Sequence, residues 1–450
     1  MTTSTQRRFA VLILGVVALS AAILAADAGD QAQTAQEQAL QAKVIAILAG
    51  VPLIDGHNDL PEQYRDRVKD HLARLDLTSD LSKLEDPMHT DIPRLRRGHV
   101  GGVFWSVYVS TSLKGSDAVQ AMFEQIDLVH RMVDRYPEVF AIATTAADVE
   151  RIHKEGKIAS LIGMEGGHSI NNSLAVLRQG YARGARYMTL THWNDTDWAD
   201  AATDKPRHNG LTPFGREVVR EMNRLGMLVD LSHVTDKTML DAMEVSEAPV
   251  IFSHSSARAL CNHVRNVPDD ILRKLAANGG VVMVNFAPGF VSEEVRVWEE
   301  PLTAEWSRLE GLYPNDPAKV RGGLKAWRAQ HPAPQATLAQ VADHVEHIRA
   351  VAGIDHVGLG SDFDGISRTP VGLEDVSKYP ALLAELMRRG WSAEDIKKLA
   401  SGNILRVMRQ AEQVAVRAQK ARPASDVRIE ELDLPPVAPE HTGPAASSSK

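Results

Sequence analysis

Residues 53–61, with the sequence LIDGHNDLP, begin with an apolar pair and end in polar side chains. Leu53 and Ile54 have the character of a buried β-strand, and His57 and Asp59 follow almost at once. Because every second residue of an extended chain points to the same side, His57 and Asp59 can approach one metal ion together. The stretch therefore predicts a rigid strand whose open end presents ligands.

Seven further apolar runs follow this one along the 450-residue chain. Counted after residues 52–57, they are 100–109, 158–167, 186–192, 227–233, 249–256, 280–288 and 356–365. Continuous apolar runs, unlike alternating ones, are typical of parallel strands that are buried on both faces. The segments between them have helical patterns, as in residues 214–226, where Gly226 predicts a helix end. Eight strand–helix units between residues 51 and 415 predict an α/β fold, a (β/α)8 TIM-like barrel.

Three other segments depart from the predicted strand–helix repeat. Residues 29–50 predict a linker and a short helix, and residues 423–450, rich in Pro, Ser and acidic residues, predict a disordered tail. Residues 293–340 form a long, irregular stretch between the seventh and eighth apolar runs. We expect this stretch to be an inserted lid or subdomain within a barrel domain that spans residues 51–415.

The N-terminal segment, residues 1–28, has the pattern of a secretory signal peptide. Arg7 and Arg8 precede an apolar run from Phe9 to Ala26, and small residues follow it. A retained membrane anchor is the alternative, because the run is close to the roughly 17 residues that the shortest transmembrane helices need. We therefore expect an exported protein, periplasmic or secreted, which contacts a membrane only through this segment if it is not cleaved.

The overall composition excludes some classes of function. With 50 basic and 58 acidic residues, the net charge of −8 gives no basic surface for nucleic acid. Apolar residues make up 44% of the chain, enough for a large core. Cys261 is the only cysteine, so the chain cannot form an internal disulfide, and its stability must come from packing and metal binding.

Polar residues cluster where six of the eight apolar runs end. They are His57 and Asp59 after the first run, then Glu165, His192, His233 and His254, and finally Asp362 and Asp364. In a (β/α)8 barrel the carboxyl ends of all strands face one mouth, where active sites are built. A single histidine at a strand end usually caps a helix or fills a core, but the coincidence at six strand ends predicts a metal site.

The number of candidate ligands favours two metal ions. The candidates are the imidazoles of His57, His233 and His254 and the carboxylates of Asp59, Glu165 and Asp362. This set exceeds the three protein ligands of a typical catalytic zinc, and Glu165 can bridge two ions through its two oxygens. Two ions about 3.5–4 Å apart can hold a water molecule and lower its pKa towards about 7, which gives a hydroxide nucleophile. Nitrogen and oxygen ligands suit Zn²⁺, Co²⁺ or Mn²⁺, and we expect zinc.

Nine motifs, in order, resemble those of the membrane dipeptidase (renal dipeptidase) family of zinc peptidases. They are DGHNDLP, GMEGGHSI, LTHWN, DLSHV, VIFSHSSAR, RNVPDD, VNF, GSDFDG and GLEDVSKYP, between about residues 51 and 410. The resemblance implies a (β/α)8 hydrolase that binds two zinc ions per chain and cleaves dipeptides. Animal members have several cysteines and a lipid-anchor signal, whereas this chain has one cysteine and a polar C-terminus. Disulfide-linked dimers and lipid anchoring therefore do not carry over, while a homodimer stays open.

The resemblance also implies which motif residues bind the metal ions. His57 and Asp59 resemble the ligands of one zinc ion. His233 and His254 resemble the ligands of the other, and Glu165 resembles the bridge between the two.

Three motif residues are implied to act on the substrate. His192 of LTHWN resembles the residue that contacts the substrate and its oxyanion, and Arg265 of RNVPDD resembles the one that binds the substrate carboxylate. Asp362 of GSDFDG resembles the acid/base beside the bridging water. A planar guanidinium suits bidentate binding of a carboxylate, which would restrict the enzyme to substrates with a nearby C-terminus.

Two alternatives to a dipeptidase stay open. An N-acyl or D-amino-acid amide hydrolase would use the same scaffold and the same metal site. A non-catalytic exported binding protein would keep the metal pocket for capture, but the presence of Asp362, the expected acid/base, argues against it.

Overall fold

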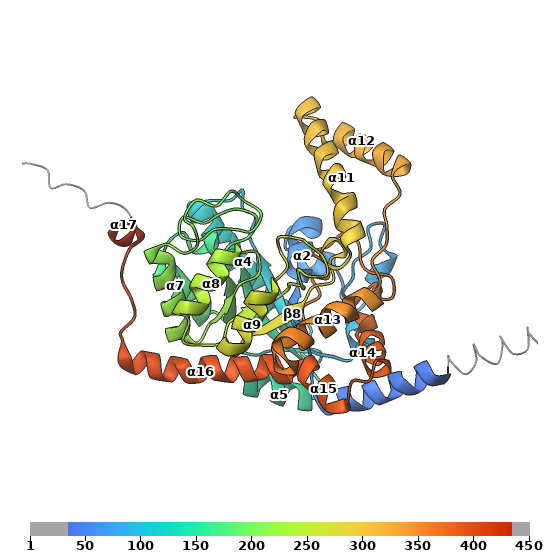
Figure 1. The fold of residues 1–450 in the computed structure, drawn as a ribbon, viewed down its shortest axis with the longest axis horizontal. Coiled ribbons are helices and arrows are strands. Elements are labelled where there is room, and N and C mark those ends of the chain that lie inside the picture. The colour runs from blue at the N-terminus through green and yellow to red at the C-terminus, as the bar shows by residue number, and fades with distance from the viewer. Residues whose placement is uncertain (1–34, 434–450) are drawn as a thin grey trace, which may run out of the picture.

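Residues 35–433, the part of the chain that this computed structural model describes, form a closed barrel of parallel strands surrounded by helices (Figure 1). The strands are β1 (Leu53–Asn58), β2 (Val100–Tyr108), β3 (Phe140–Ile142), β4 (Ile158–Glu165), β5 (Ala185–Thr189), β6 (Leu228–Asp230), β7 (Ile251–Phe252), β8 (Val281–Val284) and β9 (Val357–Leu359). They pair in the order β2-β1-β9-β8-β7-β6-β5-β4-β3, and a further pairing of β2 with β4 closes the barrel. The predicted (β/α)8 fold is confirmed.

Helices connect the strands and cover the outside of the barrel. The helices that follow β1 are α2 (Leu60–Val68), α3 (Ile92–Arg97), α4 (Gly115–Arg135), α5 (Ala146–Lys154), α6 (Leu174–Ala182), α7 (Pro213–Leu225), α8 (Asp236–Val245), α9 (Asp269–Asn278), α10 (Pro288–Val291), α11 (Glu293–Leu312), α12 (Pro317–Gln330), α13 (Leu338–Ala352), α14 (Tyr379–Arg388), α15 (Ala393–Lys397), α16 (Asn403–Ala421) and α17 (Ile429–Leu432). A further helix covers residues 35–48, before β1. Helix α7 ends where the sequence predicted, because Gly226 adopts the left-handed φ of 84° that favours glycine after a helix.

β3 is a short strand that the sequence analysis missed. Its residues pair with 158–160 at the start of β4, whereas β5 pairs with β4 only from Ile162 onwards. β3 thus occupies the edge of β4 that β5 leaves free at that end. A strand of three residues is too short to give a recognisable pattern in the sequence.

The apolar runs are continuous because both faces of the barrel strands are buried. In β1, Leu53 packs in the cluster between strands and helices, whereas Ile54 packs in the cluster inside the barrel. In β2, Trp105 belongs to the outer cluster and Phe104 to the inner one. Ile404 of α16 also joins the inner cluster, and Figure 1 shows α16 running along the base of the barrel. The apolar interior therefore closes one end of the barrel and leaves the other end for polar residues.

Residues 293–330 form two helices, α11 and α12, which project from the barrel as a hairpin (Figure 1). Leu309, Val320 and Leu324 make a small hydrophobic cluster between these helices, separate from the barrel core. The expectation of an irregular stretch was wrong here. Helix α11 has few buried apolar residues and contains Pro301, so its helical period is weak in the sequence. We refer to residues 293–330 as the α11–α12 hairpin.

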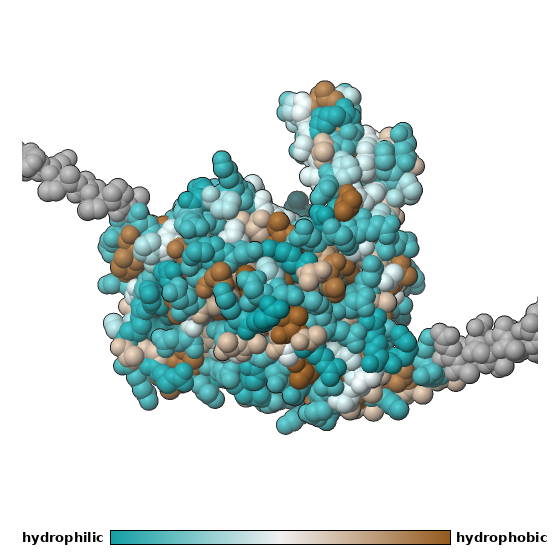
Figure 2. Space-filling model, in the orientation of Figure 1, coloured by the Kyte–Doolittle hydropathy of each residue, from teal (hydrophilic) through white to brown (hydrophobic). Residues whose placement is uncertain are grey.

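The predicted signal peptide, residues 1–28, lies outside the described residues, as do residues 434–450 of the predicted tail. Within residues 35–433, no helix is both long enough and apolar enough to span a membrane. On the face shown in Figure 2, hydrophobic residues are scattered among hydrophilic ones, as is normal on the surface of a globular protein.

The first part of the predicted tail, residues 423–433, is attached to the barrel. The carboxylate of Asp433 accepts hydrogen bonds from the Thr212 hydroxyl (2.6 Å) and from the N–H of Phe214 (2.9 Å), at the start of α7. The carbonyl of Ser425 accepts a hydrogen bond from the Arg178 guanidinium (2.7 Å). These residues therefore follow the barrel surface, although their composition resembles that of a disordered segment.

A glycine in β4 makes room for a tyrosine inside the barrel. A Cβ atom at Gly163 would collide with the ring of Tyr187 on β5. Tyr187 is fully buried, and its hydroxyl lies 2.8 Å from Nδ1 of His57 on β1. Gly163 therefore controls the position of a side chain that supports the end of β1.

We predict that Gly163→Ala destabilises the protein by about 1–3 kcal/mol, the usual cost of an overpacked core. Gly322→Ala is the matched control, because Gly322 is exposed in α12 with open space around it. Alanine is favoured over glycine inside a helix by about 0.5–1 kcal/mol, so the control should be at least as stable as the wild type. Urea unfolding followed by circular dichroism measures both free energies. A Gly163→Ala protein with wild-type stability contradicts the packing described for Tyr187.

Candidate active site

Seven of the eight predicted site residues line one cavity of about 340 Å³ at the carboxyl ends of the barrel strands. They are Asp59, Glu165, His192, His233, His254, Arg265 and Asp362. The eighth, His57, is buried beside the cavity, with its Nε2 3.3 Å from Oδ2 of Asp59. The fold therefore brings all eight side chains to one place, although they span most of the barrel sequence.

A buried carboxylate holds the end of β1 in place. Asp55 accepts hydrogen bonds from the N–H (2.8 Å) and the hydroxyl (2.6 Å) of Ser361, and from the hydroxyl of Tyr379 (2.5 Å). The N–H of Asp362 donates to the carbonyl of His57 (3.0 Å). The strand that carries His57 is thus fixed to the segment that carries Asp362.

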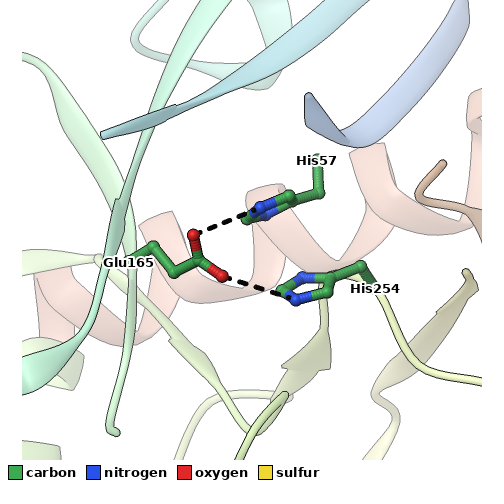
Figure 3. Close-up of side chains that lie close together, drawn as sticks. All are labelled: His57, Glu165 and His254. Atoms are coloured by element: carbon green, nitrogen blue, oxygen red, sulfur yellow. Dashed lines mark ion pairs between the residues drawn. The ribbon is translucent and has the colours of Figure 1, made fainter. Parts of the chain in front are cut away.

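Glu165, at the end of β4, lies at the centre of the site. Its Oε2 is 3.5 Å from Nε2 of His57. Its Oε1 is 3.1 Å from Nε2 of His233 and 3.5 Å from the Nε2 atoms of His192 and His254. Figure 3 shows the two oxygens pointing to His57 on one side and to His254 on the other. Oε2 of Glu165 therefore faces His57, whereas Oε1 faces the other three histidines.

Three overlapping groups of side chains have the spacing of metal ligands. The ligand atoms of each group lie within 4.8 Å of one another, and the groups are His57, Glu165 and His254; Glu165, His192 and His233; and His57, Asp59 and Asp362. His254 lies close to His57 as well as to His233, with ring centres 3.8 Å and 5.0 Å apart. Because the groups share members, they describe a single cluster around Glu165.

Several atoms in this cluster are arranged as a cation requires. Nε2 of His57 and Oδ2 of Asp59 are buried and have no hydrogen-bond partner within the described chain. Nε2 of His233 and Nε2 of His254 face each other at 2.9 Å. A buried polar atom without a partner costs free energy, which a bound ion removes when several lone pairs converge on it. The donor set therefore fits a bound metal.

The protonation states of His254 and Glu165 also suit a metal site. Burial, and then the nearby charges of His57 and Arg265, hold the pKa of His254 well below its usual value, so its ring is neutral. Burial would raise the pKa of Glu165, but His57 and His192 hold it well below its usual range. Neutral imidazole and ionised carboxylate are the forms that bind metal ions.

A second layer of hydrogen bonds orients the candidate ligands. Nδ1 of His57 lies 2.8 Å from the hydroxyl of Tyr187, and the hydroxyl of Ser106 donates to Oε2 of Glu165 (3.0 Å). Partners of this kind fix the ring orientation and tautomer of metal-binding histidines. The sequence analysis missed them, because serine and tyrosine within a strand look like ordinary strand residues.

Arg265 and His192 lie in the wall of the cavity. Arg265 is buried, its guanidinium lies 5.1 Å from the centre of the Phe290 ring, and its Nε has no hydrogen-bond partner in the described chain. Burial lowers the pKa of Arg265 to about 10, so the side chain stays positively charged at neutral pH. The ring of His192 packs against Tyr108 and His233, with ring centres 4.7 Å and 4.2 Å away. The cavity wall thus contains the buried guanidinium of Arg265, whose Nε–H is free to donate a hydrogen bond.

Asp362 follows β9 and faces the ligand cluster. Its Oδ2 accepts a hydrogen bond from the Asn285 amide (2.9 Å), and burial together with the charge of Asp59 raises its pKa to about 8. Its φ of 66° lies in the left-handed region, as do those of His233 (73°) and Asp364 (67°). Backbone strain in non-glycine residues often marks functional sites. Asp364, by contrast, does not line the cavity.

Several residues that line the cavity were not predicted. They include Glu62, Tyr108, Trp193, Glu299 and Arg368. Glu299 belongs to α11, and the guanidinium of Arg368 donates to its Oε1 (2.9 Å). The α11–α12 hairpin therefore contributes to the cavity wall. Charged residues in loops and helices, and aromatic residues near strand ends, are common, so the sequence alone gave no signal for these positions.

A closed (β/α)8 barrel with imidazoles and carboxylates converging at the carboxyl ends of its strands defines a metal-dependent hydrolase. Residues 41–422 match the family described as membrane dipeptidase, peptidase family M19. Dipeptidase 3 of Rattus norvegicus is 42% identical to the chain over 380 residues, which are 83% of this chain and 68% of that protein. The chain belongs to the membrane dipeptidase family, and it is a metallopeptidase that hydrolyses the peptide bond of dipeptides. The resemblance found in the motifs is confirmed.

Solved structures show the same architecture. A metallopeptidase of Rhodobacter sphaeroides, liganded with a phosphinate mimic of the dipeptide L-Ala-D-Ala, superposes with a TM-score of 0.65 at 25% identity, covering 80% of this chain and 99% of that one. The probable dipeptidase PvdM of Pseudomonas aeruginosa superposes with a TM-score of 0.72 at 24% identity, covering 84% of this chain and all of that one. The second likeness supports the fold alone.

We predict that Tyr187→Phe lowers metal affinity by about 10–100-fold, because it removes the partner of His57 Nδ1. Tyr64→Phe is the matched control: Tyr64 is equally buried, but its hydroxyl donates to the carbonyl of Leu75 (3.0 Å), away from the cavity. Competition with a chromophoric chelator measures both affinities. Equal affinities in the two variants would contradict a supporting role for Tyr187.

Proposed function

We propose that this metallopeptidase is a binuclear zinc dipeptidase in which Glu165 bridges the two ions. The proposal rests on the two oxygens of the Glu165 carboxylate, which face different histidines. Oε2 points towards His57, and Oε1 points towards His233 and His254. A carboxylate that binds one ion would not need imidazoles beside both oxygens. Nitrogen and oxygen donors without thiolate are compatible with zinc.

The proposed ligand sets follow from the contacts around Glu165. His57, Asp59 and Glu165 would hold the first ion. His233, His254 and Glu165 would hold the second. Each set then contains three protein ligands, which leaves room for water or substrate, as catalytic zinc sites require. Two bound zinc ions would lower the pKa of a water molecule held between them, so that it can attack a peptide carbonyl at neutral pH.

The remaining residues bind the substrate and move protons. Arg265, buried and with a free Nε, binds the C-terminal carboxylate of the dipeptide and so fixes its direction in the cavity. His192 stabilises the developing oxyanion of the scissile carbonyl. Bound metal ions would lower the pKa of Asp362 again, so that its carboxylate, held by the hydrogen bond from Asn285, can take the proton of the attacking water and pass it to the leaving amine.

Dipeptides as substrates are supported by a relative as well as by Arg265. The Rhodobacter sphaeroides metallopeptidase binds a phosphinate mimic of L-Ala-D-Ala, and a tetrahedral phosphinate resembles the state that forms when water attacks a peptide bond. A cavity of about 340 Å³ is also within the range of small-ligand sites.

We further propose that the protein is exported to the periplasm or secreted. The support is the signal-peptide pattern of residues 1–28, with two arginines before an apolar run.

We predict that the wild type binds two zinc ions per chain and that Glu165→Gln loses at least one of them together with most of its activity. An amide cannot bridge two cations with two anionic oxygens. Glu221→Gln is the matched control, because Glu221 is also buried but pairs with Arg178 (3.0 Å) and Arg224 (2.8 Å), outside the cavity. Elemental analysis of the purified proteins gives the metal content. A Glu165→Gln protein with two zinc ions and near wild-type turnover would contradict the proposal that Glu165 bridges the ions.

We predict that Arg265→Ala lowers kcat/KM for dipeptides by at least about tenfold. A charge-assisted contact in a partly dry pocket contributes about 1.5–3 kcal/mol, and each 1.4 kcal/mol is a factor of ten. The loss should appear mainly in KM, because the contact is made in ground and transition states alike. Arg265→Lys, which keeps the charge but not the planar fork, should fall between the wild type and the alanine variant.

C-terminally amidated dipeptides provide the second half of this test. The wild type should discriminate against them, and Arg265→Ala should lose that discrimination. Equal kcat/KM of the wild type for free and amidated dipeptides would show that Arg265 does not bind the substrate carboxylate. That result would favour an N-acyl or D-amino-acid amide hydrolase.

A further inference from the structure

A second cavity adjoins the active-site cavity on the side of α2. It has a volume of about 390 Å³ and shares part of its wall with the first, namely Glu62, Gly365, Ile366 and Ser367. The rest of its lining includes the carboxylates of Asp66, Asp86 and Asp364 and the basic side chains of Arg67 and His89. Glu62 therefore lies between the active-site cavity and a second space whose lining contains more carboxylates than basic groups.

Two of these carboxylates have no partner in the described chain. Asp86 forms an ion pair with Arg67 (2.8 Å). Glu62 and Asp66 form no ion pair, and their carboxylates accept no hydrogen bond from residues 35–433. They lie four residues apart on α2, where side chains of a helix are neighbours and like charges repel. The boundary between the two cavities thus carries uncompensated negative charge.

The surroundings of Glu62 strengthen this charge imbalance. The N–H of Glu62 donates to the carbonyl of Asp59 (2.9 Å), so Glu62 lies beside Asp59 as well as Asp66. The protein alone therefore offers Glu62 neighbouring carboxylates but no ion-pair partner among residues 35–433. A cation placed beside Glu62 and Asp66 would relieve both the desolvation and the mutual repulsion.

Another part of the wall of the active-site cavity would fix the direction of a bound dipeptide. Arg265, buried and with an unpartnered Nε, follows β7 and lines the same cavity as Glu62, which follows β1. In the order β1-β9-β8-β7, these strands are separated by two others, so the two side chains approach the cavity from different parts of the barrel rim. A dipeptide with its carboxylate on Arg265 would then direct its N-terminal residue towards Glu62.

We propose that Glu62, with Asp66 beyond it, selects dipeptides whose N-terminal residue carries a cationic side chain, as lysine and arginine do. This inference rests on the proposed function, because it uses Arg265 as the anchor of the substrate carboxylate. The α-ammonium group, one carbon from the scissile carbonyl, stays near the ligand cluster. Asp66 lies about one helical turn, or 5.4 Å, further along α2, a position that a side chain with a four-carbon stem can reach.

The test compares lysyl-alanine with norleucyl-alanine on the zinc-loaded enzyme. Norleucine has an unbranched side chain like that of lysine but no charge, so the ratio of the two kcat/KM values isolates the effect of the ammonium group. We expect the wild type to prefer lysyl-alanine by about tenfold and Glu62→Gln to lose most of that preference. Glu62→Lys should reverse it, favouring glutamyl-alanine over lysyl-alanine. Glu310→Gln, which removes a charge from an exposed position of α11, should leave the ratio unchanged.

The outcomes separate this inference from the proposed function. Hydrolysis of both dipeptides at equal kcat/KM by the wild type overturns the role of Glu62 and leaves the dipeptidase intact. An equal loss for both dipeptides in Glu62→Gln also overturns it, because the residue would then act on a group common to all dipeptides. If neither dipeptide is hydrolysed, the proposed function fails. In that case, calorimetry measures the binding of the two dipeptides to the wild type and to Glu62→Gln. A loss of the preference for lysyl-alanine in the variant supports the role of Glu62, and an unchanged preference overturns it.

Discussion

The buried carboxylate of Glu165 is the interaction on which the rest of the site depends. It lies within 3.5 Å of the Nε2 atoms of four histidines, each from a different strand end, and it is removed from solvent. Burying so many polar groups away from solvent costs free energy, and this cost is tolerated only where hydrogen bonds and cations offset it. The barrel supplies the hydrogen bonds, and metal ions complete the site of this metallopeptidase.

The layer beneath the site explains how such a cluster keeps its geometry. Asp55 ties β1 to the segment after β9, and Asp230 accepts hydrogen bonds from Thr189 (2.5 Å) and Ser253 (2.7 Å) across three neighbouring strands. Each of these carboxylates is fully buried and satisfied by hydroxyl and backbone donors. They hold strand ends at fixed separations, so the ligands above them are preorganised rather than assembled when an ion binds.

The substrate selection that we propose involves a different part of the structure. The ligand cluster sits on strand ends, whereas Glu62 lies on α2, Glu299 on the α11–α12 hairpin and Arg368 after β9. Loops and helices at the mouth of a (β/α)8 barrel can change without disturbing the strands, which is why this fold supports different specificities around one chemistry. In this protein the carboxylate of Glu62 and the buried guanidinium of Arg265 both line the cavity at this mouth.

The sequence by itself determined the barrel and the candidate ligands. Each of the eight predicted strands is a continuous apolar run, and each candidate ligand lies at the end of such a run or just after it, so both signals are local and the fold then brings the strand ends together. Arg265 was found only through the resemblance of its motif, since an arginine in a loop has no local signal. Tertiary structure alone decided the supporting residues and those that we propose to select the substrate. The contacts of Tyr187 with His57, the wall formed by Glu299 and the unpaired charges of Glu62 and Asp66 depend on which distant segments become neighbours. The helical state of α11 and the existence of β3 depend on packing that a weak or short sequence pattern does not reveal.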